Sequence, residues 1–111
     1  MRLATIYYNQ IMAGELVETD DGEYRFTYDS LYVNQYPLQF ITFTMPVRQQ
    51  TYVSNRLFPV FEGLIPEGWL LDIATKSWKI KSNDRMGLLL ACCKNCIGAL
   101  SVVEKEVSDE N

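Results

Sequence analysis

The sequence predicts an α+β domain, a small antiparallel sheet of about five strands with two to three helices packed against it. Three observations support this fold class. In the first half of the chain, β-type residues alternate with turn signals. Apolar residues at helical spacing follow, and one further apolar strand comes last. We expect this final strand to return to the sheet, because it needs partners for its backbone.

The first three strands follow one another closely. Residues 3–8 are strand-type, Asn9-Gln10 interrupts them, and residues 11–17 resume with β-compatible spacing, which predicts a hairpin. Asp20-Asp21-Gly22 is a turn signal, because Asp-Gly readily supplies the positive φ angles of a tight hairpin. A third strand is predicted over residues 23–28. Its alternate aromatic residues share one buried face: Tyr24, Phe26 and Tyr28.

The middle of the chain predicts a short helix and a fourth strand. A helical turn is expected over residues 29–35, and Pro37 ends it. The strand is predicted over residues 38–45. Its two faces both carry apolar groups, so we expect it to be central or covered on both sides. Residues 47–53 are interpreted as a polar connection.

A change to helical spacing begins after this connection. Ser54 is a plausible N-cap, and apolar residues recur behind it at helical intervals: Leu57, Val60, Phe61 and Leu64. Pro59 lacks an amide donor, so it is expected to kink this helix or to delay its start.

Two more helices and a strand complete the predicted domain. The second helix is expected over residues 67–79. The third is expected over 83–93, with Ser82 as its cap and Asp84 in its first turn. The last strand is predicted over residues 98–106. These elements make residues 1–106 one domain, and the acidic segment 107–111 is expected to be a disordered tail.

Composition excludes several classes of function. The net charge is −4 and the pI about 4.7, which argues against direct binding of a nucleic-acid backbone. Lys76, Lys79, Lys81 and Arg85 form the one local basic excess, which we interpret as solvated surface. The chain lacks a secretory signal and an apolar run of the roughly 20 residues that span a bilayer. We therefore expect a cytoplasmic protein.

Catalytic and cofactor motifs are missing from the sequence. There is no histidine, which removes the commonest general base and metal ligand. A phosphate-binding loop, a dinucleotide fingerprint and the kinase signatures are also absent. The chain is therefore predicted not to be an enzyme and to hold no cofactor and no metal.

The cysteines are the one cluster that resembles a chemical site. Cys93 and Cys96 have the two-residue gap of zinc knuckles and redox motifs, with Cys92 beside them. A structural zinc site needs four ligands, and a thioredoxin-like motif belongs at a helix start rather than at a helix end. Structural or incidental cysteines are favoured, and a redox or metal role remains the alternative.

The segment around Trp69 is the candidate binding site. Residues 61–71 place apolar side chains, two glycines and a proline between two predicted helices. Leu64, Leu70 and Leu71 are expected to complete the core. Trp69 would lie about 100° from the inward face of its helix, and an exposed Trp is typical of a binding anchor. The candidate partner-binding residues are Leu64, Ile65, Pro66, Glu67, Gly68 and Trp69.

The same segment carries a family resemblance. Residues 57–69 read LFPVFEGLIPEGW, which resembles the FF(D/E)-x-LLPEG-(W) motif of the N-terminal subdomain of HipA-type kinases. Residues 83–89 are similar to the family's next helix, and CIGALSV at 96–102 to a later strand. AGEL at 13–16 resembles the family's VGEL, and residues 38–47 the strand before its MPL motif.

The resemblance implies a protein that acts on a kinase. HipA proteins continue into a kinase domain, whereas Met1 and the acidic end favour a stand-alone gene product, similar to the HipS type of bacterial HipBST toxin–antitoxin systems. There, HipS neutralises HipT, a Ser/Thr kinase toxin, and a helix-turn-helix protein, HipB, binds DNA. The expected function is therefore an antitoxin that binds and inhibits a HipT-like kinase. The HipB-like protein would be reached through that kinase.

Two other functions remain open on the sequence. The chain could be a structural or activating subunit that uses the same surface on the same kinase. It could also be a small thiol redox or metal protein that uses its three cysteines.

Overall fold

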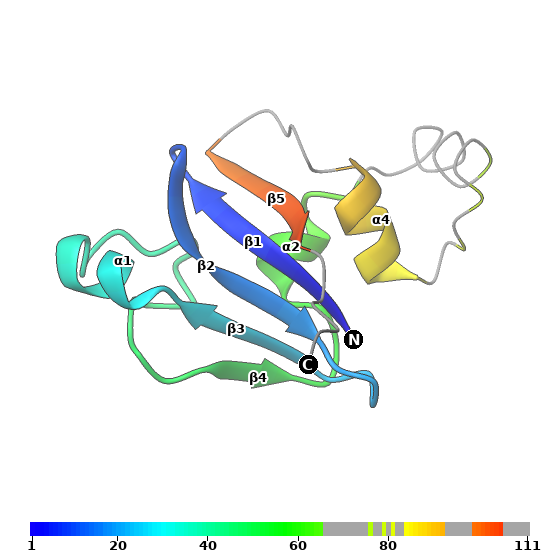
Figure 1. Ribbon diagram of the computed structural model, residues 1–111, viewed down its shortest axis with the longest axis horizontal. Helices are drawn as coiled ribbons and strands as arrows, with labels where there is room; N and C mark the ends of the chain where they lie inside the picture. The colour runs from blue at the N-terminus through cyan, green and yellow to red at the C-terminus, as the bar shows by residue number, and fades with distance from the viewer. Residues whose placement is uncertain (66–75, 77–78, 80, 82–83, 93–98, 106–111) are drawn as a thin grey trace, which may run out of the picture.

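A five-stranded antiparallel sheet forms the centre of the protein (Figure 1). The computed structural model describes residues 1–65, 76, 79, 81, 84–92 and 99–105. The strand order is β4-β3-β2-β1-β5, so the last strand returns to the sheet as predicted, where it pairs with the first. The strands are β1 Arg2–Tyr8, β2 Ile11–Glu18, β3 Tyr24–Tyr28, β4 Tyr52–Ser54 and β5 Leu100–Lys105.

The two predicted turns are confirmed. Asn9 and Gln10 join β1 to β2 with φ angles of 53° and 69°, the left-handed conformation that a two-residue hairpin turn requires. Gly22 has a φ of 87° in the connection from β2 to β3. A side chain rarely adopts this angle, so glycine is the natural residue there.

A β-bulge in β2 was not predicted. The partner of Ile6 is Gly14 and the partner of Tyr7 is Met12, so Ala13 is an extra residue on β2. Its carbonyl accepts a hydrogen bond of 2.8 Å from the amide of Asp29, just before α1 (Ser30–Gln35). The bulge therefore links the sheet to α1, whose predicted position is confirmed and whose N-cap is the Asp29 side chain.

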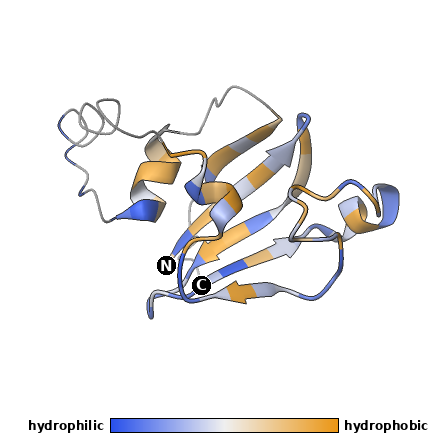
Figure 2. Cartoon of the chain, turned by 180° about the vertical axis from the view of Figure 1, so that it is seen from behind, coloured by the Kyte–Doolittle hydropathy of each residue, from blue (hydrophilic) through white to orange (hydrophobic). Residues whose placement is uncertain are grey.

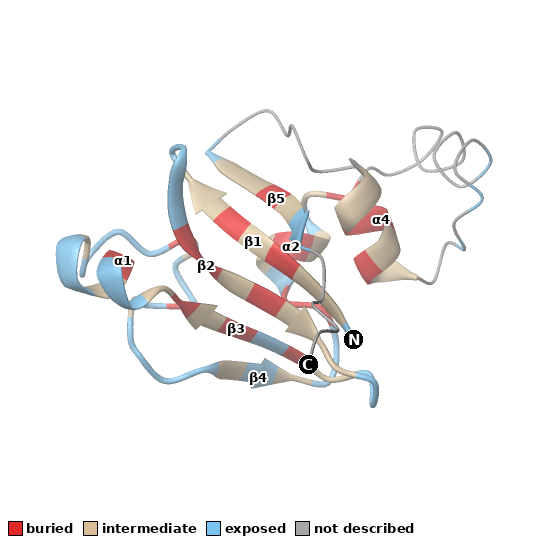
Figure 3. Cartoon of the chain, viewed as in Figure 1, coloured by how far each residue is buried: buried red, intermediate tan, exposed pale blue. Residues whose placement is uncertain are grey.

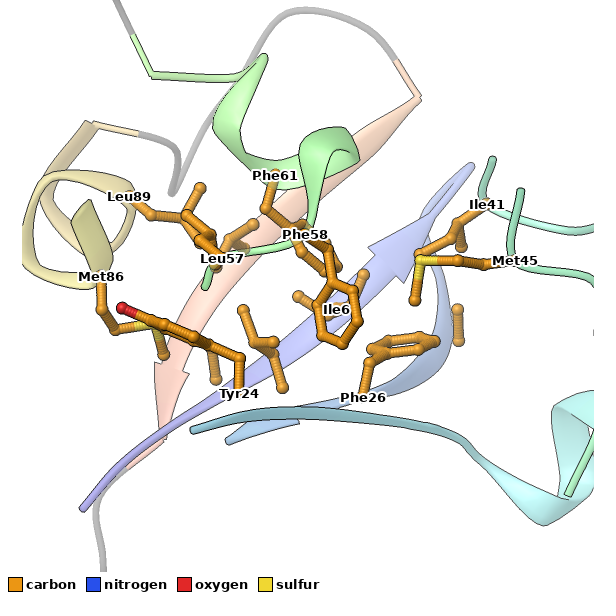
Figure 4. Packing of buried hydrophobic residues seen from close by; sticks show 14 of the residues in the cluster. Ile6, Tyr24, Phe26, Ile41, Met45, Leu57, Phe58, Phe61, Met86 and Leu89 are labelled. Carbon is orange, nitrogen blue, oxygen red and sulfur yellow. The ribbon is translucent and has the colours of Figure 1, made fainter. Parts of the chain in front are cut away.

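One face of the sheet carries the core. Buried and partly exposed residues alternate along the central strands, and Tyr24, Phe26 and Tyr28 lie on the buried face as predicted (Figure 3). Helices α2 (Pro59–Glu62) and α4 (Arg85–Cys92) cover this face, and α2 lies in front of the sheet in the view from behind (Figure 2). Figure 4 shows Phe61 and Leu89 from these helices above the strand residues.

The strand predicted over residues 38–45 is wrong. These residues form an irregular loop between α1 and β4, and the fourth strand is Tyr52–Ser54, which overlaps the end of the stretch 47–53 interpreted as connection. The reason is a tertiary contact. The Tyr28 hydroxyl accepts a hydrogen bond of 3.0 Å from the Ile41 amide and donates one to the Met45 carbonyl. These bonds satisfy buried backbone groups that a sheet partner would otherwise have to satisfy.

The predicted start of the first long helix is also wrong. α2 begins at Pro59 with Phe58 in the N-cap position, so Ser54 belongs to β4 and Leu57 precedes the helix. Proline is favoured at the first helical position, where no amide donor is needed. The expectation that Pro59 delays the helix is therefore confirmed.

The third predicted helix is confirmed, with a different cap. α4 begins at Arg85, and the Asp84 carboxylate accepts a hydrogen bond of 3.1 Å from the Gly87 amide. Asp84 thus precedes the helix, rather than lying in its first turn as predicted, and satisfies one of its free amides. Ser82, the predicted cap, lies outside the described residues, as does nearly all of the helix predicted over 67–79.

Candidate partner-binding site

The structure describes the first two residues of the candidate site. Leu64 and Ile65 follow Gly63, the C-cap of α2, whereas Pro66, Glu67, Gly68 and Trp69 lie outside the described residues. Ile65 is 3% exposed and belongs to the core, and Leu64 is partly buried against it. The segment is therefore anchored in the core where it leaves α2.

The core beneath this anchor is aromatic. Phe61 of α2 is fully buried, with its ring centroid 5.9 Å from that of Phe26 and 6.2 Å from that of Phe58. These ring contacts hold α2 to the middle of the sheet. The position from which the segment 64–69 starts is consequently set by packing on β3.

An ion pair connects α2 to the beginning of α4. The Arg85 guanidinium donates to both Glu62 carboxylate oxygens, with a shortest distance of 2.9 Å. Glu62 stands two residues before Leu64, and Arg85 is the residue at which α4 begins. The two ends of the connection that contains the candidate site are thus held together.

A second network ties α4 to the sheet. Arg2 of β1 donates to Glu18 of β2 at 2.6 Å and to Asp84 at 2.7 Å, and the Tyr24 hydroxyl donates to Glu18 at 3.1 Å. Asp84 therefore has two functions: it caps α4 and bonds to β1.

This network shifts the pKa of its members in the expected directions. The hydrogen bond from Arg2 holds the pKa of Asp84 below its usual value. Partial burial opposes this shift, and the hydrogen bond from the Gly87 amide lowers the pKa further. Burial and the Glu18 carboxylate raise the pKa of the Tyr24 hydroxyl to about 12. Asp84 is consequently ionised, and Tyr24 protonated, at neutral pH.

The Asp84 network predicts a pH-dependent stability. Because its folded pKa lies below the unfolded value of 3.8, Asp84 stabilises the fold above that pH, and the contribution is lost as the pH falls through the folded pKa. Asp84→Asn keeps a capping side chain and removes the charge, so we expect a loss of about 1 kcal/mol at pH 7. Urea unfolding at several pH values would measure both effects.

The loss of stability in acid, compared between Asp84→Asn and the wild type, decides this prediction. The variant should lose less stability than the wild type between pH 5 and pH 3. Equal losses in both proteins would show that the Arg2–Asp84 pair contributes nothing to the acid sensitivity. Asp21→Asn in the exposed β2–β3 turn is the matched control, and its stability should follow that of the wild type.

The family is decided by a comparison with known proteins. The model of the HipA N-terminal domain family matches residues 4–103 of the chain. The chain belongs to the HipA N-terminal domain family.

Two similar proteins support this assignment. A solved structure described as the N-terminal domain of HipA toxin has 26% sequence identity and a TM-score of 0.73, covering 97% of this chain and 96% of that one. An uncharacterized protein of Haemophilus influenzae is 31% identical over 91 residues, which is 82% of each chain. The HipA N-terminal fold therefore extends over nearly the whole chain.

The basic residues and the cysteines are only partly described. Lys76, Lys79 and Lys81 are exposed, which agrees with a solvated surface, but Arg85 is partly buried against Glu62 and departs from that interpretation. Within the described part of the HipA-like domain, no cluster of three potential metal ligands is present. Cys92 ends α4, and Cys93 and Cys96 lie outside the described residues. None of the described helices is long and apolar enough to span a membrane.

Besides the bulge, β4 and the Glu62–Arg85 pair, sequence reasoning missed two further features of the domain. The Arg2–Asp84 pair joins residues 82 positions apart, and no local pattern points to it. The other feature is a loop that exposes Leu38 and Phe43. A signal for it was available, because Arg48 is the only charged residue between positions 30 and 55.

Proposed function

We propose that this chain binds a separate HipA-like Ser/Thr kinase of the HipT type and inhibits it, as the antitoxin of a bacterial toxin–antitoxin system. The observation that carries the proposal is the match over residues 4–103 to a domain that HipA toxin carries at its N-terminus. A domain that normally packs against the rest of a kinase has a docking face. As a separate chain, it would bind the kinase through that face.

The segment 64–69 is our candidate for the inhibitory contact. Ile65 is buried, and the ion pair between Glu62 and Arg85 holds α2 against the start of α4. The segment therefore begins from a rigid support. In our proposal Trp69 is the anchor that enters or abuts the kinase active-site cleft, with Glu67 as a polar contact. The segment would then exclude substrate or hold the kinase in an inactive arrangement.

The proposal also defines what the chain does not contact directly. Its net charge of −4 opposes binding to a phosphate backbone. A HipB-like helix-turn-helix protein would therefore join the complex through the kinase. In this proposal the chain has no catalytic residue, metal or cofactor of its own and functions in the cytoplasm.

Co-purification of the chain with the kinase encoded beside it, followed by a kinase assay with and without the chain, tests the function. A stable complex with suppressed phosphorylation supports the antitoxin proposal. A complex with unchanged or raised activity replaces it with a supporting subunit. If no complex forms, zinc detection by native mass spectrometry and replacement of Cys92, Cys93 and Cys96 by serine become the next experiments.

Trp69→Ala tests the mechanism. Truncation of a central aromatic anchor commonly costs 2 kcal/mol or more, so we expect the kinase to be bound roughly 30-fold more weakly and its activity to return. Val53→Ala is the control, because Val53 is 56% exposed on the sheet face opposite the helices. Unchanged affinity and inhibition in Trp69→Ala would reject the anchor.

A further inference from the structure

The loop of residues 36–47, here named the aromatic loop, exposes large apolar side chains. Leu38 is 87% exposed, Phe43 83% and Phe40 39%, and the Phe40 and Phe43 rings meet edge to face at a centroid distance of 6.2 Å. Side chains of this size are costly to keep in water, and a cluster of them commonly marks an interaction site.

The backbone of the aromatic loop is held in place. Besides the two bonds of the Tyr28 hydroxyl, the Tyr32 hydroxyl donates to the Gln39 carbonyl at 2.6 Å. Ile41 and Met45 are buried, so exposed and buried side chains interleave along the loop. A partner that bound here would meet a preorganised surface and would lose little conformational entropy in ordering it.

The surroundings of the aromatic loop lack charge. Arg48 is the only charged residue between positions 30 and 55, and its guanidinium folds over the Tyr52 ring at 3.7 Å from the centroid. The rest of the chain carries the net acidic charge. Depletion of charge together with enrichment of aromatic residues is the composition of the buried centre of a protein–protein interface.

The aromatic loop covers the same face of the sheet as α2. Ile41 and Met45 lie beside Phe58, the N-cap residue of α2, and above Phe26 (Figure 4). The candidate segment leaves the other end of the same short helix at Leu64. The aromatic loop and Leu64, the described start of the candidate segment, are therefore both connected to the packing of α2, so one partner could contact both.

The size of a stable interface requires a surface beyond the segment 64–69. Specific complexes bury about 800 Å² and roughly 20–30 residues on each partner, which a segment of this length does not provide. We infer that the aromatic loop is a second docking surface for the same kinase, and that Leu38 and Phe43 insert into an apolar, uncharged surface of it. This inference rests on the proposed function.

The test is the affinity of the full chain for the kinase, measured by calorimetry on the double variant Leu38→Ser/Phe43→Ser. We expect Kd to increase at least roughly 10-fold, because two exposed apolar contacts are lost. Both side chains are mostly in water, so the fold should be retained, which circular dichroism would verify. Val53→Ser is the matched control, since it removes exposed apolar surface on the opposite face.

Each other outcome overturns the inference in a distinguishable way. If the double variant binds like the wild type while Trp69→Ala binds weakly, the aromatic loop is not a contact and the proposed function survives. If the wild type does not bind the kinase, both fail together. If light scattering shows that the free chain is a dimer which the double substitution converts to a monomer, the surface belongs to a second copy of this chain.

Discussion

Phe26→Ala is expected to lower the free energy of unfolding by about 3–5 kcal/mol, the largest single effect on stability that we predict. Phe26 is fully buried in the central part of the sheet face. Its ring lies 4.9 Å from that of Tyr28 and 5.9 Å from that of Phe61, so truncation removes two aromatic contacts and leaves a cavity. Urea unfolding followed by circular dichroism gives the change.

Phe43→Ala is the matched control for this prediction. It makes the same chemical change at a side chain that is 83% exposed, and we expect a change of at most about 0.5 kcal/mol. Similar losses in the two variants would mean that burial is not what makes Phe26 important.

Gly14→Ala is the second substitution for which we expect a large effect. A Cβ atom at this position would lie 2.4 Å from the Thr27 carbonyl oxygen and 2.8 Å from the Phe26 ring. The first contact is with backbone, so β2 and β3 would have to move apart beside the bulge. We expect a loss of about 2–3 kcal/mol, measurable by the same unfolding experiment.

Gly63→Ala separates this steric effect from the general effect of replacing glycine. Gly63 has helical φ and ψ angles of −66° and −14°, and an added Cβ would make only an ordinary contact of 3.5 Å. Alanine at such a position typically stabilises by about 0.4–1 kcal/mol through the unfolded state. If Gly14→Ala were equally harmless, the close approach of β2 to β3 would not constrain this site.

The parts of the fold that sequence reasoning predicted correctly are those with a strong local pattern. The strands over residues 2–8, 11–18 and 24–28 alternate between faces and are separated by turn signals. Asp29 also carries direct information about a helix start, whereas the start of α2 at Pro59 was predicted only as a delay of a helix placed at Ser54. In these regions the backbone preference and the tertiary structure agree, so a local pattern was sufficient.

Residues 38–45 show where local patterns fail. Their β-type composition predicts a strand, but the Tyr28 and Tyr32 hydroxyls bind the backbone of this region and make it a loop. β4 then forms from only three residues in a stretch with no strong strand signal. Strand pairing depends on which segments the tertiary structure brings together, so composition alone is a weak guide to it.

Part of the candidate site was predictable from the sequence, and part is visible only in the folded chain. The motif over residues 57–69 pointed to the family, and the match to the HipA N-terminal domain family confirmed it. The Glu62–Arg85 and Arg2–Asp84 pairs, which position the two ends of the connection, became visible only in the folded chain. Neither pair has a regular spacing in the sequence, because each depends on where two separate elements meet.

Local order in this protein thus follows from its amino-acid pattern. The α+β class, the first three strands, the helix start at Asp29 and the family motif depend on neighbours within a few residues. Contacts between distant residues settled the rest. The bulge at Ala13, the loop beneath the tyrosine hydroxyls and the ion pairs around α4 each depend on where segments far apart in the sequence meet, which a local pattern does not encode.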